Sequence, residues 1–353
     1  MQITIRCALA ALALVLAPAA AAYRDVLQVP AEASALASRT LLLSVARAGE
    51  RLVAVGQRGH VLVSDDHGAT WRQSKVPVSS DLTAVCFADD RNGWAVGHDG
   101  VILHSDDGGA SWKLQLDGFA AANAIFADAR RAAGEEPDPE RARKLMEEAR
   151  LYEAQGADKP FLDVWFADAR EGFAVGAYNL LFHTVDGGAH WESWFERADN
   201  PKRYNLHAIR RAGGELYVAG EAGLVLRLDR AADRFRAVAT PYTGSYFGIV
   251  DAGDRVLFYG LRGNVYAMGD DAKTWKRVDA GLAGSVFAAA RLRDGRIVLA
   301  DAGGNAAASA DGGRTFAPLA LEPRAPVAGL AEAGDGLLLV VGPRGATAAR
   351  VAR

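Results

Sequence analysis

The stretch GWAVG at residues 93–97, followed by HDG at 98–100, VILH at 101–104 and SDDGGASW at 105–112, decides the fold of this 353-residue chain. It consists of an apolar strand that ends in glycine, a short turn, a second strand, and a loop of the form Asp-x-Gly-x-Ser/Thr-Trp. Versions of this stretch recur along the chain, which indicates a repeat architecture.

The spacing of the repeat predicts the number of blades. The residues that end the first strand of each copy are Gly56, Gly97, Gly176, Gly220, Gly260, Asp301 and Gly342. They are separated by 41, 79, 44, 40, 41 and 41 residues, so the long step contains one period and an insertion of about 38 residues. Seven copies of four β-rich runs predict an all-β, seven-bladed β-propeller of four-stranded blades over residues 23–353, with a helical insertion between blades 2 and 3 at 117–160.

Individual strands can be placed in most copies. In the second copy we expect strands at 82–87, 94–96, 101–104 and 112–116. The last copy has only three runs, at 327–330, 337–341 and 346–351. We therefore expect the segment Asp25–Val29 to supply its missing outer strand and to close the ring, because closure removes exposed strand edges.

The loop between the third and fourth strands is an Asp-box. The carboxylate and ring positions are Asp66 and Trp71, Asp107 and Trp112, Asp186 and Trp191, Asp270 and Trp275, and Asp311 and Phe316. We expect each carboxylate to accept backbone N–H groups two residues on, glycine to supply positive φ, and the ring to fill the space between sheets. The loops lack the bidentate glutamate of an EF-hand, so we predict a structural role, no metal and no cofactor.

The insertion contains a helix signal. In Asp138-Pro139-Glu140 the aspartate suits the N-cap and the proline suits the first helical position, and Gly156 suits the end. One apolar stripe follows at helical spacing, formed by Ala142, Leu145, Met146, Ala149 and Tyr152. We expect this stripe to pack on the parent body rather than on a partner.

The N-terminus resembles an export signal. Arg6, the apolar run at 7–16 and the small residues at 20–22 predict a cleaved signal peptide at residues 1–22. The Ala- and Arg-rich composition is typical of a GC-rich bacterium, so we expect a periplasmic protein. Later apolar runs are too short for a membrane span, so we expect a protein that is peripheral to a membrane at most. We also expect a monomer.

Two further observations limit the class of function. The net charge of −3 and the pI near 6.2 argue against a nucleic-acid partner, which would need a strong basic excess. After cleavage, Cys86 is the single cysteine and can form no internal disulfide. Because it lies in an apolar run, we expect a buried and inert thiol.

The candidate binding residues lie on one face. In a propeller the turn between the second and third strands (the b–c turn) and the connection between blades (the d–a connection) share a face, opposite the Asp-boxes. Two places after each strand-ending residue stand Arg58, Asp99, Tyr178, Ala222, Arg262, Gly303 and Arg344. We expect the three arginines to surround one channel mouth and to bind a partner, although Arg-Gly is also a common solvated turn.

The d–a connections add aromatic and basic residues to this face. We include Arg203, Tyr204, Tyr242 and Tyr246 in the candidate site, because tyrosine and arginine anchor interfaces. Phe247, in the same connection, has filling the blade core as its alternative role.

Four stretches resemble the photosystem II assembly/stability factor family: GWAVG at 93–97, DVWFAD at 163–168, DGGAHW at 186–191 and GLRGN at 260–264. The resemblance covers residues 23–353 apart from the insertion. It implies a non-enzymatic accessory protein that binds membrane-protein subunits or precursors from the lumenal or periplasmic side. It also implies an arginine-rich surface patch, which Arg58, Arg262 and Arg344 match. Relatives outside photosynthetic lineages are associated with export machinery.

We therefore predict that the chain is no enzyme and binds a membrane protein or its periplasmic domain, within a membrane complex or an exporter. One alternative is a sialidase-like glycoside hydrolase, since sialidases share the Asp-box. Tyr178 and Arg262 lie on the appropriate face, but the Arg-Ile-Pro segment of a sialidase is missing and sialidases usually have six blades. Another alternative is a propeller that binds a small ligand at its channel mouth, which would need an aromatic pocket with a few polar groups.

Overall fold

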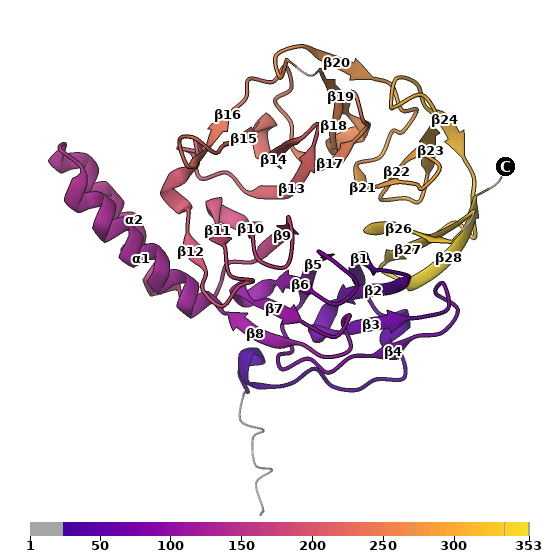
Figure 1. Cartoon of the computed structure of the whole chain (residues 1–353), viewed down its shortest axis with the longest axis horizontal. Coiled ribbons are helices and arrows are strands. Elements are labelled where there is room, and N and C mark those ends of the chain that lie inside the picture. The colour runs from indigo at the N-terminus through magenta and orange to yellow at the C-terminus, as the bar shows by residue number, and fades with distance from the viewer. Residues whose placement is uncertain (1–23, 270, 335, 352–353) are drawn as a thin grey trace, which may run out of the picture.

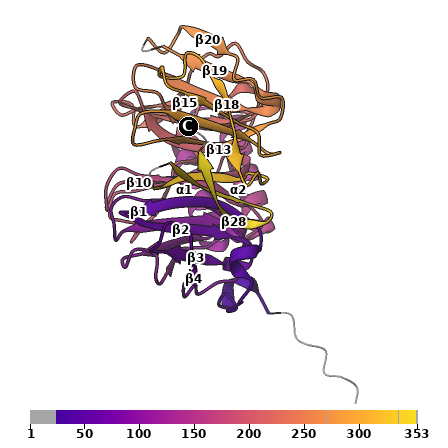
Figure 2. The same ribbon diagram turned by 90° about the vertical axis from the view of Figure 1, so that its right-hand side faces the viewer.

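The computed structural model describes residues 24–269, 271–334 and 336–351, so the predicted signal peptide at 1–22 lies outside the described residues. The described chain forms seven four-stranded antiparallel sheets arranged around a ring (Figure 1). Figure 2 shows the ring from its edge. The predicted seven-bladed β-propeller is therefore confirmed.

The strands follow one order in six blades, from the innermost strand a to the outermost strand d. Blades 1 to 3 contain β1 (Leu42–Ala48), β2 (Arg51–Gly56), β3 (Val61–Ser64) and β4 (Arg72–Gln73); β5 (Leu82–Phe87), β6 (Gly93–Gly97), β7 (Ile102–Ser105) and β8 (Lys113–Leu116); and β9 (Phe161–Phe166), β10 (Gly172–Gly176), β11 (Leu181–Thr184) and β12 (Glu192–Ser193). Blades 4 to 6 contain β13 (Leu206–Ala212), β14 (Glu215–Gly220), β15 (Val225–Asp229) and β16 (Arg234–Ala237); β17 (Tyr246–Asp251), β18 (Val256–Gly260), β19 (Val265–Met268) and β20 (Trp275–Val278); and β21 (Val286–Arg291), β22 (Ile297–Asp301), β23 (Ala306–Ser309) and β24 (Ala317–Leu319).

Blade 7 departs from this order and corrects the predicted closure. Its sheet runs β26 (Gly329–Gly334), β27 (Leu337–Gly342), β28 (Gly345–Val351) and then β25 (Leu321–Glu322). The outer strand of blade 7 is thus β25, which directly follows β24 of blade 6 in the chain. It pairs with β28 and so occupies the edge that an N-terminal strand would need. The prediction that Asp25–Val29 supplies this strand is wrong: the Asp25 carboxylate accepts the Leu27 amide and caps a 3-10 turn, Val26–Gln28.

The blades are held together by apolar packing on both faces of each sheet. Along β2, Leu52 and Ala54 pack toward blade 7, whereas Val53 and Val55 pack toward blade 2. Because side chains alternate between the two faces of a strand, each blade contributes to two interfaces. The ring is closed by this packing between blades 7 and 1 rather than by a shared sheet.

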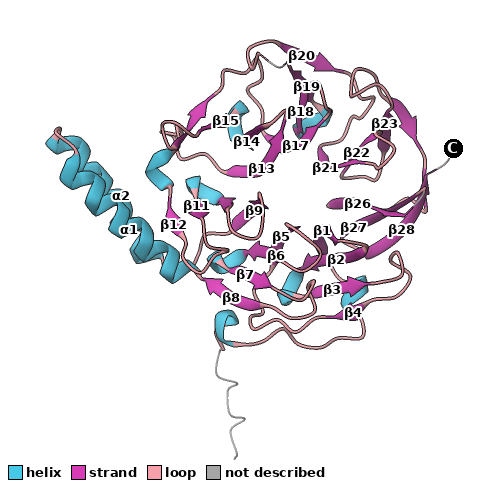
Figure 3. Ribbon diagram, viewed as in Figure 1, coloured by secondary structure: helices cyan, strands magenta, loops and turns pink. Residues whose placement is uncertain are grey.

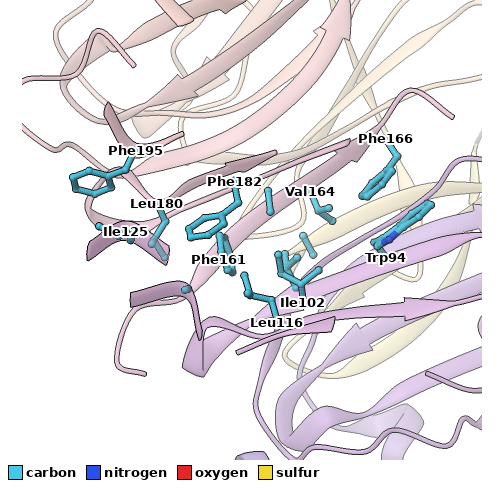
Figure 4. Close-up of a cluster of buried hydrophobic side chains, with 14 of the residues drawn as sticks. Trp94, Ile102, Leu116, Ile125, Phe161, Val164, Phe166, Leu180, Phe182 and Phe195 are labelled. Atoms are coloured by element: carbon cyan, nitrogen blue, oxygen red, sulfur yellow. The ribbon is translucent and has the colours of Figure 1, made fainter. Parts of the chain in front are cut away.

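One extensive buried cluster lies between blades 2 and 3. Figure 4 shows Trp94 stacked on Phe166, with ring centroids 3.4 Å apart, and Phe161 edge-on to Phe182 at 5.6 Å. All four residues belong to one buried cluster. A fully buried aromatic or aliphatic side chain contributes about 1.5–3 kcal/mol to folding, so this interface is a main source of stability.

The insertion forms a hairpin of two helices that projects from the ring beside blade 3 (Figures 1 and 3). The predicted helix is confirmed as α2 (Pro139–Gln155), with Asp138 as the N-cap and Gly156 at the end. Its partner α1 (Gly118–Glu135), capped by the Asp117 carboxylate, was not predicted from the sequence. Tyr152 of the apolar stripe enters the cluster between blades 2 and 3, so at this residue the expected packing on the parent body is confirmed.

The Asp-boxes hold the c–d loops by a repeated hydrogen-bond pattern. Asp66 accepts the Thr70 amide at 2.9 Å and the Thr70 hydroxyl at 2.5 Å, and the Ser64 hydroxyl accepts the Gly68 amide at 2.8 Å. The accepted amide is four residues on, not two as expected, because the glycine turn brings the chain back over the carboxylate. Asp107, Asp186 and Asp311 likewise accept the amide four residues on, and at Asp186 the His190 ring takes the place of the hydroxyl.

The fifth box and the box rings complete this pattern. The predicted Asp270 lies outside the described residues, and Asp271 is the carboxylate that accepts the Thr274 amide and hydroxyl. The box rings pack into clusters between blades: Trp112 is buried, and Trp71, Trp191, Trp275 and Phe316 are half-buried. The predicted structural role of the boxes agrees with these contacts.

We expect the boxes to make stability depend on acid. Hydrogen bonds from Thr70 and His190 lower the pKa values of Asp66 and Asp186 from 3.8 to about 2. A carboxylate whose pKa is lower in the folded than in the unfolded protein stabilises the folded state at pH values above its unfolded-state pKa. This contribution is lost as the pH falls from about 4 to about 2. Acid titration followed by circular dichroism should show a shallower loss of stability over this range in an Asp66→Asn/Asp186→Asn variant, with Asp90→Asn as the exposed control. Equal slopes in all three proteins would contradict this role.

Candidate partner-binding face

The b–c turns share an unusual backbone. In five blades the turn is a short 3-10 segment, namely Gln57–Gly59, His98–Gly100, Ala177–Asn179, Glu221–Gly223 and Leu261–Gly263. The middle residues, Arg58, Asp99, Tyr178, Ala222 and Arg262, have φ between 51° and 58°. This left-handed conformation is unfavourable for residues other than glycine. Because Ala222 adopts it too, the strain belongs to the turn and not to one special residue.

The residue after each strained position allows the d–a connection to lie against the turn. A Cβ on Gly263 would lie 1.7 Å from the carbonyl oxygen of Leu282, and one on Gly223 would lie 1.8 Å from that of Tyr242. In blade 3 Asn179 replaces this glycine, and its amide donates to the Phe195 carbonyl at 2.8 Å. These contacts bring the b–c turns and the d–a connections to one face, as expected.

Arginines occupy this face on four successive blades. Arg262, Arg344 and Arg58 lie on the b–c turns of blades 5, 7 and 1 and are exposed. Blade 6 has Gly303 at this position, but Arg324 from the next connection donates Nε to the Gly303 carbonyl at 3.2 Å. The backbone of Arg39 likewise lies against the blade 7 turn at Gly345. We call these residues the arginine arc: Arg39, Arg58, Arg262, Arg324 and Arg344.

The sequence alignment missed Arg39 and Arg324, because both lie on d–a connections of variable length and not at the aligned turn position. Arg324 could have been found because it follows blade 6, whose own turn has glycine at the aligned position. Arg39 could have been found because its connection leads into blade 1 and lies beside the blade 7 turn. Alignment by spacing registers the regular turns only, whereas these two residues reach the same surface from a neighbouring blade.

The cations of the arc are unpaired within the described part of the chain. Among the described residues, no carboxylate lies within ion-pair distance of any of the five guanidinium groups. The nearby Asp81 carboxylate accepts the backbone amide of Arg58 at 2.7 Å, and Ser285 accepts that of Arg262 at 3.2 Å. The turns are thus held by their backbone, which leaves the guanidinium groups free to bind carboxylates of another molecule.

The arc does not line the central channel. The central cavity is lined by innermost strands, including Leu162, His207, Phe247 and Phe287, and by none of Arg58, Arg262 and Arg344. The b–c turns stand one strand further out than the innermost strands, so the arginines lie at a larger radius than the cavity, on the side of blades 5, 6, 7 and 1. Phe247 faces this cavity and does not fill the blade core.

Two other predicted residues are unavailable to a partner. Tyr246 is 0% exposed, and its ring packs among Tyr242, Phe258 and Tyr266, so its assignment to the binding site is wrong. Arg203 donates to Glu148 at 2.8 and 2.9 Å and to Glu196 at 2.6 Å. It is therefore occupied in joining α2 to blade 3.

The remaining predicted residues differ in exposure. Tyr178 is 58% exposed and remains a candidate, and Asp99 and Tyr204 are half-buried. Tyr242 is also half-buried, and its hydroxyl donates to the Leu261 carbonyl at 3.2 Å, so it supports the blade 5 turn that carries Arg262.

The helical hairpin borders the same face. The Tyr152 hydroxyl donates to the Tyr178 carbonyl in the blade 3 turn, and Lys159 lies 4.5 Å from the Tyr152 ring centroid. A cleft of about 760 Å³ separates the hairpin from the connection between blades 3 and 4, and its charged lining includes Glu148 and Arg203. The hairpin is thus a fixed wall beside Tyr178.

Other chemistry is limited in the described residues. No cluster of three or more His, Cys, Asp or Glu side chains there has the arrangement needed to hold a metal ion. Burial raises the pKa of the Cys86 thiol to about 12, so this cysteine stays protonated and unreactive. Within the same residues, no helix combines the length and apolar character that a membrane crossing requires.

Comparison with known proteins identifies relatives of this architecture. A family model described as photosynthesis system II assembly factor YCF48 matches residues 30–124 and 149–322, with the gap inside the hairpin. The photosystem II assembly lipoprotein Ycf48 of Synechococcus sp. (strain CC9902) is 28% identical over 157 residues, or 44% of this chain and 47% of that protein. The match therefore spans about half the length of this relative.

Solved structures share the fold. YCF48 bound to a D1 peptide has a TM-score of 0.63 at 14% identity, covering 90% of this chain and 95% of that one. YCF48 from Cyanidioschyzon merolae has a TM-score of 0.61 at 17% identity, covering 91% and 98%. The WD40 propeller domain of Doa1 reaches 0.61 at 10% identity, covering 92% and 96%. At these identities the likeness shows the fold alone.

Together, the ring of blades and the arginine arc define a seven-bladed β-propeller whose connecting turns carry the candidate binding residues. The match of the family model over most of the ring places it more closely. The chain belongs to the photosystem II assembly factor YCF48 family, which confirms the resemblance found in the sequence.

We expect opposite effects from two substitutions in the b–c turns. Gly263→Ala should lower the free energy of unfolding by about 2 kcal/mol or more, because a Cβ there meets the Leu282 carbonyl at positive φ. Ala222→Gly should raise it by up to about 1 kcal/mol, because glycine relieves the left-handed strain. Urea unfolding followed by circular dichroism measures both, and two changes of the same sign would refute this account of the turns.

We expect Arg203 to fix the hairpin to the ring. Arg203→Ala should speed amide hydrogen exchange in α2 by roughly tenfold, because Glu148 and Glu196 lose their shared partner. Arg143→Ala is the control, since Arg143 pairs with Glu147 on the exposed side of the same helix and such pairs contribute little. Similar exchange in the two variants would show that Arg203 does not hold the hairpin.

Proposed function

We propose that this chain is a periplasmic, non-enzymatic propeller that binds a membrane protein and assists the assembly or stability of a membrane complex or an exporter. The family membership supports the assembly role, since both the family model and the matched relative are described as photosystem II assembly proteins. The export-type N-terminal sequence supports the periplasmic location. The photosystem itself is not part of the proposal.

The unpaired arginine arc is the observation that carries this proposal. Four successive blades present guanidinium groups on one face, although the whole chain has a net charge of −3. No ion-pair partner for these cations is found among the described residues, so a partner molecule with carboxylates would supply one. We therefore expect the partner to present an acidic periplasmic segment to the turns of blades 5, 6, 7 and 1.

The hairpin and Tyr178 extend this face on the other side of the ring. Tyr178 and Phe119 are 58% and 52% exposed, and Phe119 lies beside Gly156 at the base of the hairpin. Exposed aromatic side chains beside a charged surface are typical of binding interfaces. A partner that lies across the face would meet cations on one side and these rings on the other.

The arc can be tested by charge reversal. Affinity capture from gently solubilised membranes should recover a membrane protein with the wild-type chain and at least about tenfold less with Arg58→Glu/Arg262→Glu/Arg344→Glu, because three attractive contacts become repulsive. Recovery by the wild type should also fall as salt is raised, since exposed charges are screened.

A matched control keeps the change of charge but moves it away from this face. Arg91→Glu/Arg170→Glu/Arg211→Glu alters three exposed arginines at the a–b ends of blades 2, 3 and 4, on the Asp-box side, for which no ion pair is found among the described residues. This variant should capture as much as the wild type. If the two triple variants lose capture equally, net charge and not the arc governs binding. Recovery of no membrane protein by the wild type would reject the assembly role.

A further inference from the structure

The innermost strands enclose a cavity of about 160 Å³ at the centre of the ring. We call the residues at the start of the innermost strands the rim of this cavity. In blades 1 to 6 the rim residue is the second of its strand, and in blade 7 it directly precedes the strand: Leu43, Thr83, Leu162, His207, Phe247, Phe287 and Ala328. The rings are all on blades 4, 5 and 6, which lie side by side around the central opening (Figure 1). The rim is therefore aromatic on one side only.

The aromatic side of the rim presents a flat apolar surface. The rings of Phe247 and Phe287 are stacked with their centroids 4.8 Å apart and an interplanar angle of 4°. Phe287 is nevertheless 44% exposed, and His207 lies 5.5 Å from Phe247 on the other side. Exposed phenylalanine gains free energy when a ligand covers it.

An acidic side chain just below the rim is fully engaged. Asp163, which follows the rim residue Leu162, is 4% exposed. Its carboxylate accepts the Val164 amide at 3.0 Å, the Ile209 amide at 2.8 Å and Nη1 of Arg210. Asp163 therefore holds Arg210 in place and joins blade 3 to blade 4.

The arginine it holds is an open polar group of the cavity. The Arg210 side chain is 43% exposed and lines the cavity, and its Nη1 also donates to the Ile209 carbonyl at 2.6 Å. Among the described residues, Nε and Nη2 have no hydrogen-bond acceptor. Since Nη1 donates to the Ile209 carbonyl, two residues along β13 from the rim residue His207, the guanidinium lies about 7 Å, two residues of strand, below the rim.

A further aromatic side chain, Tyr259, contributes to the wall of the cavity. Gly248 on β17 leaves room for the Tyr259 side chain of β18, since a Cβ there would lie 2.2 Å from the Tyr259 ring. Tyr259 thereby reaches the cavity wall. A purely structural role, in which the ion pair joins blades 3 and 4, would explain the contact between Asp163 and Nη1 of Arg210. It would not require open guanidinium donors below an exposed aromatic stack.

We propose that this cavity binds a small organic carboxylate whose carbon skeleton is one ring. The carboxylate would accept from Nε and Nη2 of Arg210, the paired arrangement that guanidinium groups favour, while the ring lies on Phe287. The volume agrees, because a cavity of about 150 Å³ holds a benzene molecule. This site is separate from the arginine arc and does not depend on the proposed function.

Phenylacetate is a suitable probe. Saturation-transfer NMR and titration calorimetry on the full mature chain should show that it binds, and that phenylacetamide and acetate bind at least about tenfold more weakly, because each lacks one half of the recognition. Phe287→Ala should weaken phenylacetate binding by roughly tenfold. Arg210→Lys should do the same, because lysine keeps the charge beside Asp163 but lacks the paired donors.

Two controls separate this site from the rest of the face. Tyr178→Ala removes an exposed ring outside the cavity and should leave phenylacetate binding unchanged, as should the triple charge reversal of Arg58, Arg262 and Arg344. The proposal is overturned if phenylacetate does not bind, if phenylacetamide binds equally well, or if Phe287→Ala has no effect. Because Phe287 lies at the rim, this variant tests the site even if Arg210→Lys does not fold.

Discussion

Each blade of this propeller must be buried on both faces, and this constraint underlies the rest of the structure. Leu52 and Val53 are neighbours in β2, yet one packs toward blade 7 and the other toward blade 2. A sheet with two apolar faces cannot be stable alone, so the blades are stable only in a closed ring. Closure by packing, without a strand exchanged from the N-terminus, is sufficient because the interface between blades 7 and 1 has the same construction as the others.

The ring then determines where variation is tolerated. Strands and Asp-boxes must fit two neighbours, whereas the b–c turns and d–a connections need only their own backbone contacts, such as that between Gly263 and the Leu282 carbonyl. At four of the five strained turn positions the side chain is exposed, and the residue type varies from blade to blade. Arg58, Ala222 and Arg262 occupy equivalent turns with the same φ, so chemistry changes from blade to blade without a change of fold.

Two surfaces of different chemistry result. The arginine arc is wide, exposed and cationic, and it suits an extended acidic partner. The central cavity is small, with one anchored guanidinium and an aromatic rim, and it suits a single small anion. Arg203 belongs to neither surface, because Glu148 and Glu196 occupy it. A basic residue is therefore a candidate for binding only when its own fold leaves some of its donors without an acceptor.

The sequence by itself determined the ring, because a period near 41 residues, strand-ending glycines and the box pattern of Ser64, Asp66 and Gly68 are local signals. It also determined α2, whose cap and end are adjacent to the helix. Only the tertiary structure decided that Tyr246 is core, that Arg324 reaches the blade 6 turn, and that Asp163 holds Arg210 from the next blade. These outcomes depend on contacts between distant segments, and burial and pairing are set by those contacts rather than by residue type or spacing.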